Sequence, residues 1–194
     1  MARGAESRGC CGHVPGGNWQ VTCLAVASRR ALPFDPIAEA ERQWVSHGWA
    51  AAAPGMAAVT SVMRAQQILL ARADEVLRPF ALTFARYEVL MLLSFSRRGA
   101  LPLGKVGERL QVNPASVTNA INRLEAAGLV RREANPADRR GTLAAITAAG
   151  RHVAGSATAA LNRELFSSLG LPEAALAQLV GVLRELRRAA GDFE

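Results

Sequence analysis

The feature that most constrains the fold of this chain is residues 101–147, where two short helical patterns precede two extended segments and a basic loop. Apolar residues three and four apart predict one helix over 103–110 and a second one after a turn at 111–113. Asn113 and Pro114 suit the N-cap and the first position of the second helix, since asparagine caps well and proline there loses no hydrogen bond.

A β-hairpin is predicted to follow these helices. Gly128 ends the second helix, and residues 129–133 and 142–146 have the pattern of two strands bounded by turn residues. Helix, turn, helix and hairpin in this order predict a winged helix-turn-helix lobe over residues 99–147. The predicted fold class is mainly α with a small antiparallel β-wing, in which this lobe is joined to a helical dimerisation region.

A long helix is predicted before the lobe, from Met56, after a break at Pro54 and Gly55, to Pro79. Its apolar stripe, interrupted by one glutamine, consists of Met56, Val59, Met63, Gln66, Leu70, Ala73, Leu77 and Phe80. A second stripe beside it consists of Val62, Leu69 and Val76. Two apolar stripes on one helix predict burial on two sides, against its own core and against a partner.

Further helices are predicted over residues 36–48, opened by Asp35, over 84–98, and after the caps Thr147 and Pro172. The N-terminal segment is rich in Gly, Arg, Ser and Cys without periodicity, which is typical of a disordered tail. The predicted divisions are a tail, two parts of a helical dimerisation region and the lobe between them: residues 1–32, 33–98, 148–194 and 99–147.

Outside residues 1–32, which carry a net charge of +3, most of the positive excess of the chain lies in the predicted lobe. The 194 residues carry a formal net charge of +7, and residues 101–147 contribute seven basic and four acidic side chains, a net +3. A basic patch attracts the phosphate backbone of nucleic acid. Without the helix-turn-helix pattern, an ordinary solvated charged face would explain this patch equally well.

Cysteine and histidine usage argues against a disulfide framework, a metal site and an enzyme. Cys10, Cys11 and Cys23 all lie near the N-terminus, and their spacing with His13 matches no familiar zinc pattern. The apolar run at 21–27 is too short to span a membrane. No nucleophile–base pair and no glycine-rich cofactor loop occurs. We therefore expect a cytoplasmic protein with no catalytic residue, no metal and no cofactor.

The second helix of the motif separates cleanly into two sides at 100° per residue. The core side consists of Val117, Ala120, Ile121 and Leu124. The opposite side is short and polar and consists of Ala115, Thr118, Asn119 and Asn122, flanked by Ser116 and Arg123. Such a surface suits a major groove, where asparagine pairs with adenine and arginine with guanine or phosphate. The alternative is an ordinary solvated face.

The predicted hairpin places two arginines near its tip. Asn135 and Pro136 signal a turn, and Asp138, Arg139 and Arg140 follow. Arginine is favoured in a narrow minor groove, whereas Asp138 is repelled by phosphate and is expected to orient an arginine or the turn. The alternative is a tip whose charges serve solubility.

These segments resemble the MarR family of bacterial transcription regulators. The resemblance rests on NPASVTNAINRLE, on RLEAAGLVRREANPADRRGTLAAIT and on the AAG that follows, and it covers roughly residues 56–190. It implies a homodimer with interleaved terminal helices on a pseudo-palindromic operator, and repression relieved by a small anionic or aromatic ligand. The implied DNA contacts are Ser116, Thr118, Asn119, Asn122 and Arg123 in the major groove, and Arg140 in the minor groove with Arg139 and Asp138 nearby.

The resemblance also implies candidate ligand-binding residues. The extra helix over 36–48 resembles a branch that senses urate-like or carboxylate ligands. In that branch a tryptophan on this helix lies near the pocket, and Trp44 matches it in residue type and rough place. Arg86 and Tyr87 are further candidates, and for all three simple packing is the alternative. The peroxide-sensing branch uses a cysteine on the long helix, which this chain lacks.

A second functional class remains open from the sequence. Winged helices also serve as protein-interaction or dimerisation modules without a ligand response, for example in front of some methyltransferases. Specific retention of DNA from upstream of the protein's own gene distinguishes a regulator from such a module.

Overall fold

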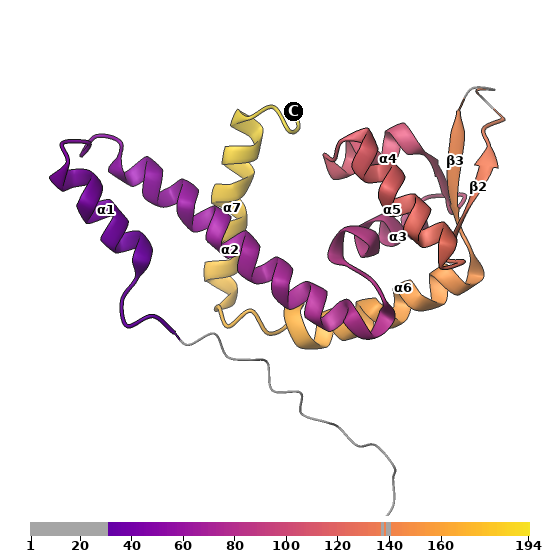
Figure 1. Ribbon diagram of the computed structural model, residues 1–194, viewed down its shortest axis with the longest axis horizontal. Helices are drawn as coiled ribbons and strands as arrows, with labels where there is room; N and C mark the ends of the chain where they lie inside the picture. Colours follow the sequence, from indigo (N-terminus) through magenta and orange to yellow (C-terminus); the bar gives the residue numbers. More distant parts are fainter. Residues whose placement is uncertain (1–30, 137, 139–140) are drawn as a thin grey trace, which may run out of the picture. The chain divides into compact units, whose positions relative to one another are not determined.

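The computed structural model describes residues 31–136, 138 and 141–194. The predicted fold class is confirmed, because helices dominate these residues and three short strands form one antiparallel sheet (Figure 1). The chain divides into two compact units at the boundary between Ala53 and Pro54. The predicted tail, with its cysteines, lies outside the described residues except for its last two positions.

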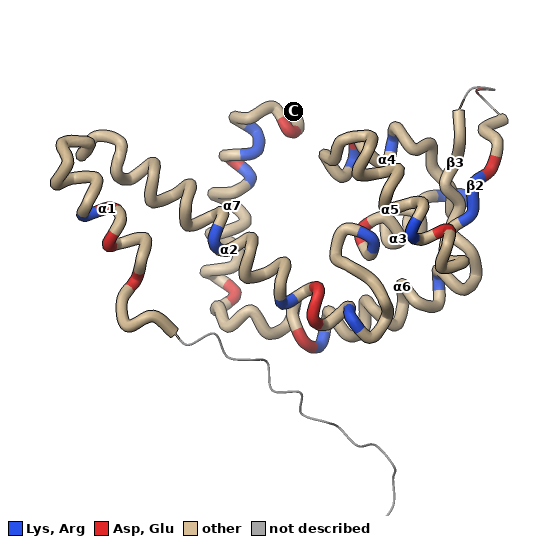
Figure 2. The backbone as a smooth tube through the Cα atoms, viewed as in Figure 1, with Lys and Arg blue, Asp and Glu red and all other residues tan. Residues whose placement is uncertain are grey.

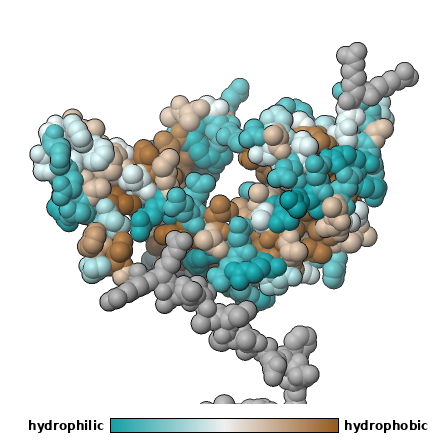
Figure 3. Space-filling model, in the orientation of Figure 1, coloured by the Kyte–Doolittle hydropathy of each residue, from teal (hydrophilic) through white to brown (hydrophobic). Residues whose placement is uncertain are grey.

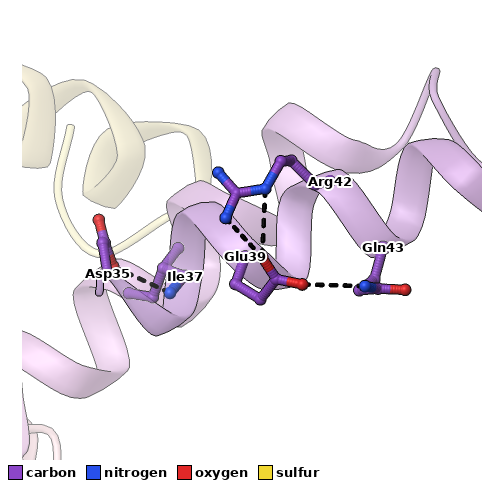
Figure 4. A network of polar contacts seen from close by, with 5 residues as sticks. All are labelled: Asp35, Ile37, Glu39, Arg42 and Gln43. Carbon is purple, nitrogen blue, oxygen red and sulfur yellow. Dashed lines mark hydrogen bonds and ion pairs between the residues drawn. The ribbon is translucent and has the colours of Figure 1, made fainter. Parts of the chain in front are cut away.

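The first unit contains the predicted short helix α1 (Pro36–Ser46). As expected, Asp35 is its N-cap and accepts a hydrogen bond from the N–H of Ile37 at 2.9 Å. Glu39 accepts hydrogen bonds from Gln43, at 2.9 Å, and from Arg42 (Figure 4). These two partners lower the pKa of the Glu39 carboxyl. Because the pair is exposed to water, the contacts orient the side chains and contribute little to stability.

The second unit contains the long helix α2 (Ala53–Leu77) except for its first residue, and α2 continues as the 3-10 turn η1 (Arg78–Phe80). The predicted break at Pro54 and Gly55 is wrong, since both residues lie in the first turn of α2, where backbone N–H groups need no helical partner. The next helix, α3 (Phe84–Phe95), ends before the predicted Arg98. Asp74 joins the two helices by accepting a hydrogen bond from the N–H of Phe84 at 2.6 Å.

A three-stranded sheet and two short helices follow α3. The sheet has the order β1 (Ala100–Pro102), β3 (Thr142–Ile146), β2 (Val130–Ala134), and both pairs of strands are antiparallel. The helices are α4 (Leu103–Leu110) and α5 (Pro114–Ala126), close to their predicted positions. The core of the second unit is formed jointly by the helices and the sheet, and the described part of the chain buries no charged side chain in it. Its largest fully buried side chains are Leu77, Leu90, Leu93, Val106, Ile121, Leu124, Val130 and Leu161.

The C-terminal helices are α6 (Ala148–Leu161), extended by the π-helical turn η2 (Asn162–Phe166), and α7 (Glu173–Ala189). Thr147 caps α6 as predicted, because its Oγ1 accepts from the N–H of Gly150 at 3.0 Å. The same hydroxyl donates to the carbonyl of Gly128 at 2.8 Å, which ties the end of α5 to the start of α6. No helix in the described part of the chain has the length and apolar character needed to cross a membrane.

The close approach of α6 to the sheet predicts that Gly150→Ala destabilises the protein. An added Cβ would overlap the carbonyl oxygen of Leu129 and lie 2.8 Å from Cγ1 of Ile146. We expect a loss of about 2 kcal/mol or more in the free energy of unfolding, measured with urea. Gly155→Ala on the same helix is the control, because a Cβ there meets no atom within 4 Å among the described residues. It should gain about 0.5–1 kcal/mol; equal effects of the two substitutions would contradict this packing.

The half-buried Glu88 on α3 predicts a pH-dependent stability. Burial raises the pKa of the Glu88 carboxyl above its ordinary 4.5. The folded chain thus holds this proton more tightly than the unfolded chain, so stability falls as the pH rises above 4.5 and the loss is complete above the folded pKa. Glu88→Gln should raise the melting temperature at neutral pH, and the gain should shrink as the pH falls through the folded pKa and be absent below pH 4.5. Glu185→Gln, at an exposed site, is the control, and a Glu88→Gln gain that persisted in acid would contradict the account.

Candidate nucleic-acid interface

A tight turn joins α4 to α5. Gln111 ends α4 in the left-handed conformation, with φ of 52°, and the N–H of Val112 bonds to the carbonyl of Gly107 at 3.1 Å. A Cβ at Gly107 would lie 3.2 Å from the carbonyl oxygen of Val112 and 3.3 Å from Cγ2 of Val117. Gly107 therefore permits the close approach of the two helices, a role that the sequence pattern did not reveal.

Helix α5 is held by its apolar side and by its cap. Val117, Ile121 and Leu124 are 2%, 0% and 1% exposed. Asn113 is the N-cap, as predicted, and its Oδ1 accepts a hydrogen bond from the N–H of Ser116 at 2.8 Å. Because the buried side chains fix the rotation of α5 about its axis, the opposite side of the helix must face outward.

The outward side of α5 carries the five residues predicted for the major groove, which we call the polar edge: Ser116, Thr118, Asn119, Asn122 and Arg123. All five are exposed. The hydroxyl of Thr118 donates to the carbonyl of Pro114 at 2.9 Å, which leaves its methyl group and its lone pairs for other contacts. The structure thus brings these residues together on one surface, and their contact with DNA stays a prediction.

A polar contact that the sequence analysis missed joins the polar edge to β2. Arg132 donates from Nη2 to Oδ1 of Asn122 at 2.6 Å. It also forms an ion pair with Glu125, whose Oε1 accepts from the backbone N–H of Arg132 at 3.2 Å. Basic and acidic residues lie close together along β2 and at the end of α5 (Figure 2). Strand alternation was the available signal, because it puts Arg132 and Arg131 on opposite faces.

The base of the wing is a closed turn. The N–H of Asn135 bonds to the carbonyl of Gly141 at 3.1 Å, and the N–H of Gly141 bonds to the carbonyl of Asp138 at 2.9 Å. Arg139 and Arg140, predicted for the minor groove, lie outside the described residues. A Cβ at Gly141 would lie 3.1 Å from both Nδ2 of Asn135 and Oδ2 of Asp138, so the turn packs tightly around this glycine.

The three ligand candidates have different surroundings. Trp44 lies in the first unit, where its ring contacts that of Trp49 edge-on with centroids 5.2 Å apart. Tyr87 is 7% exposed, and its hydroxyl is 3.0 Å from Oγ1 of Thr158 on α6. Arg86 is partly buried and donates from Nε to Oγ1 of Thr83 at 3.2 Å. Tyr87 thus has a packing role in the core, and the ligand role of all three stays a prediction.

An open cavity of about 500 Å³ lies between α4 and α5. Its lining includes Gly104, Gly107, Glu108, Val117 and Thr118, and it includes none of the three ligand candidates. Since Thr118 belongs to the polar edge, this cavity is part of the same surface.

Helices α4 and α5 are joined by a tight turn, and α5 is buried on one side and exposes polar side chains on the other. Together with the β-hairpin of β2 and β3, this arrangement defines a winged helix-turn-helix protein. The family model described as "MarR family" matches residues 82–142. A structure of Sco5413, a MarR family transcriptional regulator from Streptomyces coelicolor, is 50% identical in sequence, with a TM-score of 0.68. The match covers 73% of this chain and 98% of that one. The chain therefore belongs to the MarR family of transcriptional regulators, which are DNA-binding proteins.

Two further solved structures show what other relatives bind. Sco3205, a MarR family transcriptional regulator from Streptomyces coelicolor, was solved in complex with DNA; it is 26% identical, with a TM-score of 0.60 over 68% of this chain and 84% of that one. CouR from Rhodococcus jostii RHA1 was solved bound to p-coumaroyl-CoA; it is 25% identical, with a TM-score of 0.56 over 64% and 87%. No protein with a curated function matches the chain.

The polar edge predicts a specific effect of Asn119→Ala. Asn119 is exposed at the centre of the edge, where its amide has both a donor and an acceptor. Removing it should weaken binding to operator DNA by about 1–3 kcal/mol and leave binding to unrelated duplexes unchanged, as measured by fluorescence anisotropy. Asn162→Ala on η2 is the matched control. Equal operator affinity of the Asn119 variant and the control would show that the edge is wrongly assigned.

Proposed function

We propose that the protein is a homodimeric repressor that binds a pseudo-palindromic operator and releases it when a small anionic or aromatic molecule binds. The observation that carries the proposal is the polar edge of α5, which is exposed along its length while Val117, Ile121 and Leu124 on the opposite side of the helix are buried. A surface of short, mostly uncharged side chains can approach base edges closely, whereas long charged side chains would hold the helix at the phosphates. A protein that binds chromosomal operators would act in the cytoplasm, and we propose this location.

The dimer is supported by apolar side chains that a single chain leaves in water. On α7 the exposed apolar residues are Leu179, Val180, Val182 and Leu186, and on α2 they are Val59, Val62, Met63, Ile68, Leu69 and Leu70. Hydrophobic side chains accordingly reach the surface along both helices (Figure 3). In contrast, Ala73 and Leu77 at the end of α2 are buried in the chain's own core. An apolar surface of this extent is typical of a protein interface.

A dimer would give the operator its symmetry. Two copies related by a two-fold axis present two α5 helices, and both enter successive major grooves only when they lie about 34 Å apart. Each wing would then approach the neighbouring minor groove with Arg139 and Arg140. The predicted divisions of the chain follow from this role: helices before and after the lobe would set the separation of the two lobes.

The ligand response would act on that separation. A molecule bound between the dimer helices and a lobe would favour an arrangement in which the two α5 helices no longer match the grooves. It shifts the equilibrium only by the difference of its affinities for the two arrangements, and a coupling of 1–3 kcal/mol changes operator affinity about 5- to 150-fold. Trp44, Arg86 and Tyr87 remain the candidate contacts, and CouR, which binds an aromatic, anionic thioester, supports this class of ligand.

The proposed function is tested with the DNA upstream of the protein's own gene. Gel retardation at two salt concentrations should show specific retention that weakens with salt. Aromatic carboxylates and their CoA thioesters are then screened by thermal shift, and those that raise the melting temperature should release the operator. Specific retention without release by any stabilising compound would remove the ligand response, and no specific retention would support an interaction module instead.

The dimer predicts the effect of a charge on the apolar side of α7. Leu179 is 46% exposed in the single chain, so Leu179→Glu costs little within one copy but places a charge in the proposed interface. We expect a monomer by light scattering and loss of operator binding. Ala177→Glu adds the same charge at an exposed position on the opposite side of α7 and should leave a dimer. Dimers of both variants would contradict the assigned interface.

A further inference from the structure

We infer that Arg132 and Glu125 are positioning residues that hold the amide of Asn122 with its NH2 group turned outward, so that Asn122 recognises a hydrogen-bond acceptor on DNA. This inference rests on the proposed function, because it names what one residue of the polar edge selects. Neither Arg132 nor Glu125 belongs to the polar edge itself.

The geometry of Arg132 carries the inference. Its guanidinium spans two partners on α5: Nη2 donates to Oδ1 of Asn122 at 2.6 Å, and Nη1 pairs with Oε2 of Glu125. The other carboxylate oxygen of Glu125 accepts from the backbone N–H of Arg132 at 3.2 Å. Glu125 thus fixes both the strand and the planar fork of the guanidinium, and the arginine side chain is 29% exposed.

This arrangement restricts the chemistry available to Asn122. Bidentate recognition of adenine needs the carbonyl and the NH2 group of one amide together, since adenine presents an acceptor beside a donor. The carbonyl of Asn122 uses one of its two lone pairs to accept from Arg132, which holds this oxygen toward β2, whereas both N–H donors of the amide stay available to a ligand. The positive charge behind the amide further favours an acceptor. The matching groups in DNA are purine N7, guanine O6, thymine O4 and the phosphate oxygens.

Two neighbours of the same residue types lack this arrangement. Arg131 precedes Arg132 on β2, but its Nε donates to Oε1 of Glu133 at 2.6 Å, on the opposite face of the strand. Asn119 lies one turn before Asn122 on the polar edge, without a restraint of this kind from β2. Arg131 is therefore a matched control for Arg132: it shares the strand, the charge and an acidic partner, but it does not touch the polar edge.

The test is selection of bound sequences from a randomised duplex library by the full-length protein. The wild type should select a base pair whose preference Asn122→Ala abolishes. Arg132→Met removes the guanidinium and frees the amide to rotate, so preference at that same base pair should fall about tenfold. Arg131→Met should leave it unchanged. With Asn122→Ala already present, Arg132→Met should have no further effect on this preference, because the two residues act as one unit.

The outcomes separate the inference from the proposed function. A wild type that selects no sequence overturns the proposed function. Specific selection in which Arg132→Met and Asn122→Ala alter different base pairs, or act additively, overturns only the inference. If the acceptor is a phosphate, Asn122→Ala and Arg132→Met should both weaken binding without changing base preference, and methylphosphonate substitution at that phosphate should weaken binding by the wild type to the same level. Should Arg132→Met fail to fold, Glu125→Gln loosens the same guanidinium, and its unaltered preference would equally overturn the inference.

Discussion

The burial of one side of α5 is the constraint on which the rest of the interface depends. Val117, Ile121 and Leu124 are almost completely removed from water, and each contributes about 2 kcal/mol when buried. Rotating α5 about its axis would expose these side chains and bury polar ones. The free energy of the core therefore sets which side chains can meet DNA, and the polar edge needs no restraint of its own to face outward.

Polar contacts add precision where apolar burial cannot. Arg132 ties β2 to the polar edge, and the hydroxyl of Thr147 ties the end of α5 to the start of α6. The lobe is thus complete within one chain. In contrast, many apolar side chains of α2 and α7 find no cover within one chain and are exposed to water. This contrast fits the proposed dimer, in which each chain folds its own lobe and the long helices of the two chains pack against each other.

Much of the fold could be predicted because its signals are local. Caps such as Asn113 and Thr147, and the spacing of apolar residues, act within a few positions of the chain. The break at Pro54 was wrong because proline also suits the first turn of a helix. Tyr87 was named for a pocket, but its burial depends on α6, distant in sequence. The contact of Arg132 with Asn122 likewise requires the packing of β2 on α5, which no local pattern encodes.

The most direct test of the central claim is photocross-linking from a benzophenone side chain introduced at position 119, with position 159 on α6 as the control. If the buried side of α5 sets the rotation of the helix about its axis, the probe at 119 should cross-link to bases of the bound operator, and the probe at 159 should not reach DNA. A complex that forms normally but yields cross-links only from position 159 would contradict the account.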